Sequence, residues 1–367
     1  MIEIEWIILE EKEYGFLVEE DCPKNIKEAV DLEEGEKWRT AMEEEMETLK
    51  KMETWKLKDL LKDRKAIGCK WVFVRKRDKM GMIVQWRARL VAQGFSQKPG
   101  MDYHNDRTFA PVMHFETLRT LLAHAAVNKL KLRQFNVKGA YLHGHLKETI
   151  YMAQPPRFKD GSGRVCLLKQ SLYGLKQARN VWNQELNRVL FEIGFKQLKT
   201  DYCCYIKTSN DDSSILVVWV NDFLSLSTKE TLNDNIEGGL NKHFKVKSLG
   251  QPKLLLGIKI DIGENYISLS QSHYIDILLE KYGLADANPM STPMDLNIKL
   301  DLEVKDSKGQ PKDNACLKIG HTYAQLIGSL MYITLGTHPD ISYAVNKLAQ
   351  FTSDPKPMHW TAIKRIF

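Results

Sequence analysis

Apolar residues recur along this 367-residue chain with the spacings of both helices and strands. Between residues 36 and 53, large apolar side chains return every three or four positions, with glutamates on the opposite face, which predicts an amphipathic helix. Two further helices are predicted over residues 116–128 and 182–191, the second closed by Gly194. No repeats or low-complexity tracts interrupt this mixture of helix and strand.

The strand signals begin with a predicted β-hairpin. Residues 71–74 and 85–92 are rich in β-branched and aromatic side chains and are joined through residues 78–81. A separate strand is predicted to end at Asn136, directly after the helix over residues 116–128. Residues 285–314 are rich in Pro, Asp, Asn and Lys, a composition that predicts a linker.

A second predicted hairpin has two polar residues at its tip. The apolar runs 215–220 and 223–227 flank Asn221-Asp222. Both residue types tolerate the left-handed backbone of a tight turn, so the pair alone is explained by turn chemistry. Its surroundings favour a functional interpretation, because a second carboxamide, Asn136, ends another strand. Between these positions lies the motif QSLYGLKQA, and three ordered motifs are far more specific than any one of them.

Composition narrows the class of protein. The chain is 43% hydrophobic and 27% charged, typical of a soluble globular protein, and no apolar run approaches the roughly 18 residues of a membrane span. The first residues carry no basic leader, which argues against a signal peptide. Six cysteines show no CxxC spacing, so we expect neither a zinc knuckle nor a disulfide framework. These features predict an intracellular protein, cytoplasmic or nuclear, without a membrane partner.

Charge is distributed unevenly along the chain. The first 50 residues hold 17 acidic and six basic side chains, whereas residues 51–100 hold 14 basic and four acidic ones. Concentrated positive charge suggests a polyanionic partner, since each phosphate contact releases condensed counterions. A solvated basic face is the alternative that charge alone leaves open.

The motifs, taken in order, resemble those of copia-type LTR retrotransposon reverse transcriptases. The resemblance extends from about residue 36 to the carboxyl terminus. It rests on AIGCKWVF (66–73), RARLVAQGF (87–95), TFAPV (108–112), SLYGLKQA (171–178), IGSLMY (327–332) and HPDI (338–341).

The resemblance implies an α+β, right-hand polymerase fold of fingers, palm and thumb. Its parts are expected in chain order: an acidic lead or linker remnant (1–35), fingers with an N-terminal helix (36–128), palm with a fingers insertion at about 146–178 (129–250), thumb (251–300) and a truncated connection region (301–367).

The family copies RNA or DNA into DNA by attack of a primer 3′-hydroxyl on a deoxynucleoside triphosphate, with two Mg²⁺ ions clamping the reacting oxygens. Its catalytic, metal-binding aspartates match positions 136, 221 and 222. This chain has Asn136 and Asn221 at two of them and retains only Asp222. Because Mg²⁺ prefers charged oxygen ligands, we expect its binding to be weakened and catalysis to be severely impaired or absent.

The resemblance also assigns nucleotide-binding positions. Tyr141 matches the aromatic residue that excludes a ribose 2′-hydroxyl, although a core role is the alternative. Basic residues of the fingers are expected to face the triphosphate, and part of the SLYGLKQA motif is expected to lie against nucleotide and template. These residues are Lys70, Lys76, Arg89, Tyr173, Gly174 and Lys176.

Three interpretations of function follow. The first is a reverse transcriptase domain with a degenerate active site, whose partners are an RNA or DNA primer–template and deoxynucleoside triphosphates. The second is a host-retained, non-catalytic nucleic-acid-binding protein. The third is a pseudogene product. In the first case we expect a piece of a polyprotein that lacks the gag, protease, integrase and ribonuclease H parts.

Overall fold

The computed structural model describes residues 22–77, 82–295, 300 and 323–367. They form two compact units, with the boundary between Pro252 and Lys253. The predicted turn at residues 78–81 lies outside the described residues, as does most of the predicted linker beyond residue 295. The described part of that linker, up to residue 295, contains no helix or strand.

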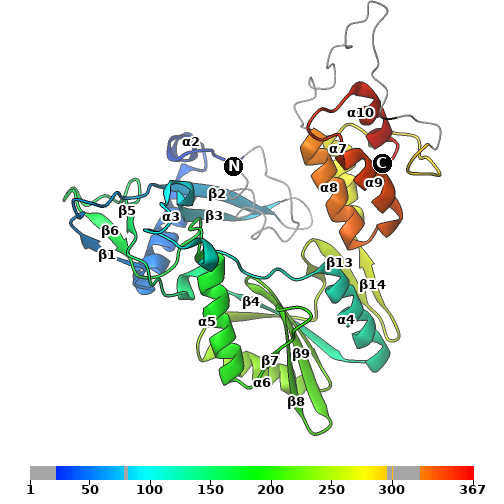
Figure 1. Ribbon diagram of the computed structural model, residues 1–367, viewed down its shortest axis with the longest axis horizontal. Coiled ribbons are helices and arrows are strands. Elements are labelled where there is room, and N and C mark those ends of the chain that lie inside the picture. The colour runs from blue at the N-terminus through cyan, green and yellow to red at the C-terminus, as the bar shows by residue number, and fades with distance from the viewer. Residues whose placement is uncertain (1–21, 78–81, 296–299, 301–322) are drawn as a thin grey trace, which may run out of the picture. The chain divides into compact units, whose positions relative to one another are not determined.

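The centre of the first unit is a six-stranded sheet with strand order β11-β4-β10-β9-β8-β7, in which every neighbouring pair is antiparallel (Figure 1). Its strands are β4 (Lys131–Val137), β7 (Lys196–Gln197), β8 (Cys204–Ser209), β9 (Asp212–Trp219), β10 (Asp222–Ser227) and β11 (Val246–Gly250). Around the sheet lie α4 (Phe115–Asn128), α5 (Ala178–Glu192) and α6 (Glu230–Asn241).

Helix α6 packs against β4, β10 and β11, and β10, an interior strand of the sheet, is buried almost throughout. Two serines of β10 remain polar inside this layer because each has a hydrogen-bond partner. The Ser225 hydroxyl donates to Asn233 Oδ1 of α6 at 2.7 Å, and the Ser227 hydroxyl donates to Ser214 Oγ of β9 at 2.8 Å. These contacts fix the strand whose first residue is Asp222.

The amino-terminal part of the first unit is built on a two-stranded hairpin, β2 (Cys69–Arg77) and β3 (Ile83–Ala92), with helix α3 (Gly35–Lys51) packed against β3. The same part of the unit contains a three-stranded sheet of order β1-β6-β5. Its strands are β1 (Trp55–Lys58), β5 (Tyr151–Met152) and β6 (Val165–Leu168), and the short helices of this unit are α2 (Ile26–Asp31), η1 (Gly94–Ser96), η2 (Asn105–Arg107) and η3 (Ala140–His143).

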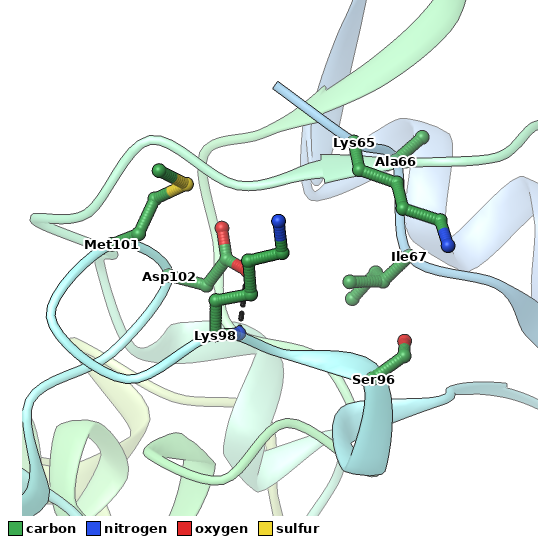
Figure 2. Close-up of a pocket in the computed structure, with 7 residues that line it drawn as sticks. All are labelled: Lys65, Ala66, Ile67, Ser96, Lys98, Met101 and Asp102. Atoms are coloured by element: carbon green, nitrogen blue, oxygen red, sulfur yellow. Dashed lines mark hydrogen bonds between the residues drawn. The ribbon is translucent and has the colours of Figure 1, made fainter. Parts of the chain in front are cut away.

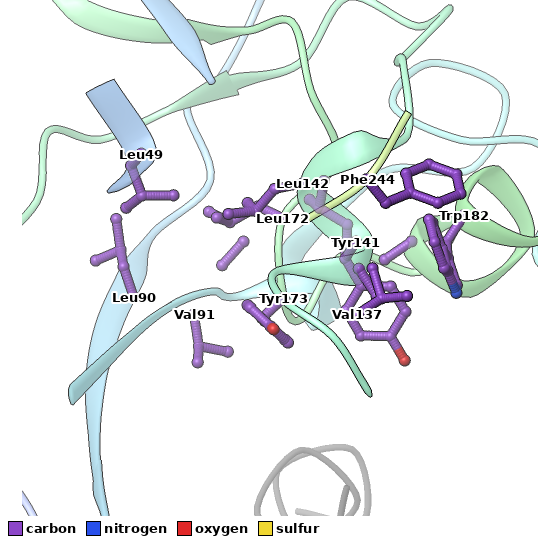
Figure 3. Packing of buried hydrophobic residues seen from close by; sticks show 14 of the residues in the cluster. Leu49, Leu90, Val91, Val137, Tyr141, Leu142, Leu172, Tyr173, Trp182 and Phe244 are labelled. Carbon is purple, nitrogen blue, oxygen red and sulfur yellow. The ribbon is translucent and has the colours of Figure 1, made fainter. Parts of the chain in front are cut away.

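One hydrophobic core joins the hairpin part to the six-stranded sheet. Figure 3 shows Leu49 and Leu90 on one side of this core and Trp182 and Phe244 on the other, with Tyr173 between them. All five side chains are buried. The core therefore holds the segment around Tyr173 in place from both sides.

The second unit contains a three-stranded antiparallel sheet and a group of helices. The strands are β12 (Leu254–Leu255), β13 (Ile258–Ile262) and β14 (Ile267–Ser270), and the helices are α7 (Ser272–Lys281), α8 (Tyr323–Gly336), η5 (Pro339–Ile341), α9 (Ser342–Ala349) and α10 (Pro357–Lys364). Among all described residues, no helix is both long enough and apolar enough to span a membrane.

The predicted α+β class is confirmed, and the helix and strand predictions are confirmed with shifted ends. The helix expected over residues 36–53 is α3, and the one expected over residues 116–128 is α4. The helix expected over residues 182–191 begins four residues earlier, at Ala178. The predicted tip of the second hairpin was wrong by one residue: Asp222 pairs with Trp219 inside the ladder, so the connection is Val220-Asn221.

Candidate functional site

Strands β4 and β10 bring Asn136 and Asp222 directly opposite each other. The antiparallel register pairs these two residues, and both side chains are half-buried. The Asn136 Nδ2–H donates a hydrogen bond to Asp222 Oδ1 at 2.8 Å. Two of the three expected metal-binding positions are thus joined by a hydrogen bond, with the Asn136 amide as donor and the Asp222 carboxylate as acceptor.

Asn221 lies in the turn that precedes Asp222, and backbone hydrogen bonds fix this turn on two sides. The Asn221 carbonyl accepts from the Val137 N–H at 2.8 Å, and the Trp182 Nε1–H of α5 donates to the Val220 carbonyl at 2.7 Å. Val220 has φ of 53°, which is unusual for a β-branched residue. Such strain costs about 1–3 kcal/mol and persists only where the surroundings over-determine the backbone.

The residues at these three positions do not fit a pair of Mg²⁺ ions. Mg²⁺ requires oxygen ligands, preferably charged, whereas Asn136 directs an N–H toward the one carboxylate that remains. Across the described residues, no group of three or more His, Cys, Asp or Glu side chains is arranged to hold a metal.

Tyr141 and Tyr173, two more of the expected site residues, contact each other. Tyr141 lies five residues beyond Asn136, in the short helix η3. Gly139, which directly precedes η3, has a left-handed backbone (φ 64°). The two rings meet edge to face, with centroids 5.2 Å apart, and both side chains are buried. The structure thus places two of the expected nucleotide-binding residues in contact, although they come from different motifs.

Gly174 allows its segment to lie directly against the end of β3. The Ala92 N–H donates to the Tyr173 carbonyl at 2.8 Å. Gly174 has φ of 87°, and a Cβ at this position would lie 2.2 Å from the Ala92 carbonyl oxygen. Gly94 is equally confined, since its Cβ would lie 2.0 Å from the Gly174 carbonyl oxygen.

We expect Gly174→Ala to lower the free energy of unfolding by about 2 kcal/mol, because the new Cβ meets backbone and the left-handed conformation is itself unfavourable. Chemical denaturation monitored by tryptophan fluorescence measures this change. Gly161→Ala is the matched control, because Gly161 also has a positive φ (76°) but no atom within 4 Å of the Cβ position. Equal losses in both variants would refute the close-approach argument.

Two buried glutamines that were not among the expected site residues hold the same segment, although Gln177 belongs to the SLYGLKQA motif. Gln97 Oε1 accepts from the Lys176 N–H at 2.9 Å, and Gln97 Nε2 donates to Gln177 Oε1 at 3.0 Å. Gln177 Nε2 in turn donates to the Asp102 carbonyl at 2.9 Å. The Lys176 side chain extends to the Tyr103 ring, 5.4 Å from its centroid. Glutamine is usually exposed, so nothing in the linear pattern indicates that these two are buried.

The basic residues expected in the fingers lie on one face of the β2–β3 hairpin. Arg89 pairs with Val72 in the β2–β3 ladder, and Lys70 and Lys76 lie two and four residues from Val72, on the same side. Lys70 and Lys76 are half-buried. The Arg89 guanidinium lies over the Tyr173 ring, 5.2 Å from its centroid, and also pairs with Glu45 of α3 at 2.9 Å. Glu45 was not identified from the sequence.

Two pockets of the described first unit differ in their relation to the expected site residues. The larger, about 630 Å³ when space open to solvent is included, adjoins Tyr141 and Val220. Its other lining residues are Ala110, Pro111, Val112, Met113, Arg179, Trp182, Asn183, Leu186, Cys203, Tyr205, Val218 and Trp219. The smaller, about 270 Å³, is lined by Lys65, Ala66, Ile67, Ser96, Lys98, Met101 and Asp102 and contains none of the expected site residues (Figure 2).

Comparison with known proteins places these residues in a family. A sequence profile described as "Reverse transcriptase (RNA-dependent DNA polymerase)" matches residues 52–296. The chain is 37% identical, over 96% of its length, to the retrovirus-related Pol polyprotein from transposon TNT 1-94 of Nicotiana tabacum, covering 27% of that protein. It is 34% identical, over 98% of its length, to the Pol polyprotein from transposon RE1 of Arabidopsis thaliana, covering 24% of that protein. The chain therefore spans about a quarter of these relatives.

Among solved structures, a foamy viral protease–reverse transcriptase in complex with double-stranded DNA aligns with a TM-score of 0.42 and 10% identity, over 90% of this chain and 47% of the other. Reverse transcriptases in general depend on divalent metal ions. On the profile match, which covers more than half of the chain, and the transposon relatives, this protein belongs to the reverse transcriptase family of copia-type Pol polyproteins.

Proposed function

We propose that this chain is a reverse transcriptase domain that binds primer–template but has largely lost nucleotidyl transfer. The observation that carries the proposal is the hydrogen bond from Asn136 to Asp222. It joins two of the positions at which the family resemblance requires metal-binding carboxylates. Two Mg²⁺ ions would bring four positive charges to this site. Of the three expected carboxylates, only that of Asp222 is present, and its Oδ1 accepts a hydrogen bond from a neutral amide N–H.

The size of the effect follows from electrostatics. At an effective dielectric constant near 20, a unit charge pair at 4 Å is worth about 4 kcal/mol. Solvent recovers part of this, yet a loss of about 3 kcal/mol at either position is roughly a hundredfold in rate. The two positions act on the same metals, so their effects need not add.

The same proposal divides the chain into working parts. We assign residues 36–128 and the insertion at about 146–178 to fingers, the rest of residues 129–250 to palm, residues 251–300 to thumb, and residues 301–367 to the connection region. The unit boundary at Pro252–Lys253 supports a palm that ends near residue 250. The substrates would be an RNA or DNA primer–template and deoxynucleoside triphosphates, in a polyprotein that supplies the remaining activities.

Binding of a fluorescent primer–template, measured by anisotropy over a range of salt concentrations, tests the nucleic-acid part of this proposal. We expect log K to fall linearly with log salt, with a slope steeper than about −3, because several phosphates exchange counterions for Lys and Arg. No binding, or binding that salt does not change, would contradict it. Primer extension by the unmodified chain at wild-type family rates would contradict the loss of catalysis instead.

A further inference from the structure

Glu45 is a carboxylate inside an apolar helix face. The buried side of α3 carries large apolar residues at Trp38, Met42, Met46 and Leu49, and Glu45 falls within this stripe. Its side chain is only 5% exposed. Because an isolated buried carboxylate is strongly unfavourable, Glu45 requires a cationic partner.

That partner is Arg89 of β3. Arg89 Nη1 lies 2.9 Å from Glu45 Oε2, and the arginine side chain is 11% exposed. A buried ion pair of this kind is a poor source of stability, since desolvation of both groups offsets their attraction, and apolar residues of similar volume often serve equally well. Stability alone therefore does not explain a Glu at this position.

The position of Arg89 indicates another role. Its guanidinium lies over the Tyr173 ring at 5.2 Å, and the Tyr173 ring contacts Tyr141. Arginine presents a planar fork that suits phosphate oxygens. A phosphate that reaches this guanidinium meets a positive charge that already pairs with the Glu45 carboxylate.

We propose that Glu45 is a built-in anion that competes with a bound triphosphate for Arg89, so that it sets the affinity of the site and favours highly charged polyphosphates over monophosphates. The inference rests on the proposed nucleotide site. A monophosphate that displaces Glu45 from Arg89 gains little binding free energy, because the displaced carboxylate stays buried without the Arg89 guanidinium. A triphosphate brings enough charge to offset that cost.

The chain contains a matched ion pair for comparison. Glu34, which precedes α3, lies 2.8 Å from Arg75 Nη2 of β2, with side chains 25% and 10% exposed. The Trp86 Nε1–H donates to Glu34 at 3.1 Å, and this hydrogen bond, with Arg75, lowers the pKa of the Glu34 carboxyl. The pair thus joins the start of the same helix to the same hairpin, but it involves no residue expected at the nucleotide.

Isothermal titration with inorganic tripolyphosphate, without metal and at constant ionic strength, tests the inference. We expect Glu45→Gln to bind it about tenfold more tightly than the unmodified chain, because the competing charge is removed while the side-chain shape is kept. The gain should disappear in the double variant Glu45→Gln, Arg89→Ala. Glu34→Gln should leave the affinity unchanged, and the preference for tripolyphosphate over orthophosphate should be smaller in Glu45→Gln than in the unmodified chain.

Thermal unfolding verifies that each variant is folded. If Glu45→Gln does not fold, Glu45→Asp replaces it, because aspartate keeps the charge but withdraws it from Arg89. Glu45→Asp should give a smaller gain in tripolyphosphate affinity. An equal gain in tripolyphosphate affinity in Glu34→Gln would overturn the inference, because the gain would then reflect only the loss of one negative charge from the protein. No gain in either Glu45 variant, or a gain that survives removal of Arg89, would overturn it as well. Primer–template binding of the same variants separates this failure from failure of the proposed function.

Discussion

The double variant Asn136→Asp, Asn221→Asp is expected to extend a primed RNA template in the presence of Mg²⁺ at least about a hundredfold faster than the unmodified chain. Both substitutions introduce charged oxygens beside Asp222, because β4 places Asn136 opposite it and Asn221 directly precedes it in the chain. The turn is held by hydrogen bonds of the backbone rather than by the Asn221 side chain, so the added carboxylates should not displace it.

The measurement is incorporation of deoxynucleotides on a primed RNA template with Mg²⁺ and, separately, Mn²⁺. The single variants Asn136→Asp and Asn221→Asp are the controls, and each should remain well below the double variant. Equal activity in the unmodified chain would mean that Asp222 and the substrate phosphates suffice to hold the metals. A double variant that binds primer–template yet never extends it would place the defect elsewhere in the site.

Asn136→Asp alone is expected to destabilise the metal-free protein by about 3 kcal/mol at pH 7. The change removes a hydrogen bond to a charged group, worth about 1.5–3 kcal/mol, and sets two carboxylates against each other. For a unit of this size the melting temperature should fall by roughly 5–10 °C. Thermal unfolding in the presence of a chelator measures it.

The loss should depend on pH with a definite sign. Repulsion between the introduced carboxylate and Asp222 raises one apparent pKa of this pair above the unfolded value of about 3.9. The penalty is therefore absent below the unfolded pKa and develops as the pH rises through the raised folded pKa. Asn136→Ala, which loses the hydrogen bond without adding charge, should show a smaller loss that stays constant at pH values well above the unfolded pKa of about 3.9. A pH-independent difference in Asn136→Asp, or no recovery with millimolar Mg²⁺, would refute the repulsion.

Local features of the fold were predictable because they depend on neighbours in sequence. The 3.6-residue stripe of α3 and the β-branched runs of β2 and β3 follow directly from which side chains must be buried. Ends of elements were less predictable. Helix α5 includes Ala178 and its neighbours because Gln177 and Asn180 find partners elsewhere in the fold, on Gln97 and on the Phe109 carbonyl.

The tip of the second hairpin shows the same limit. Asn-Asp is the better turn sequence, yet the structure places Val220 in the left-handed position. The competing requirement is the register of β10 with β4, which sets Asp222 opposite Asn136 and moves the turn back by one residue. At this turn, strand pairing therefore outweighs the turn propensity of the local sequence, as often happens at functional sites.

By itself, the sequence determined the family, the mixture of helices and strands, and the presence of carboxamides at Asn136 and Asn221, because ordered motifs and residue identity are properties of the linear chain. Only the tertiary structure decided which groups bond to one another. Asn136 contacts Asp222 across 86 residues, Arg89 contacts Glu45 across 44, and Gln97 contacts Gln177 across 80. Such contacts depend on strand register and on how helices pack, and no local periodicity encodes the partner of a buried polar group.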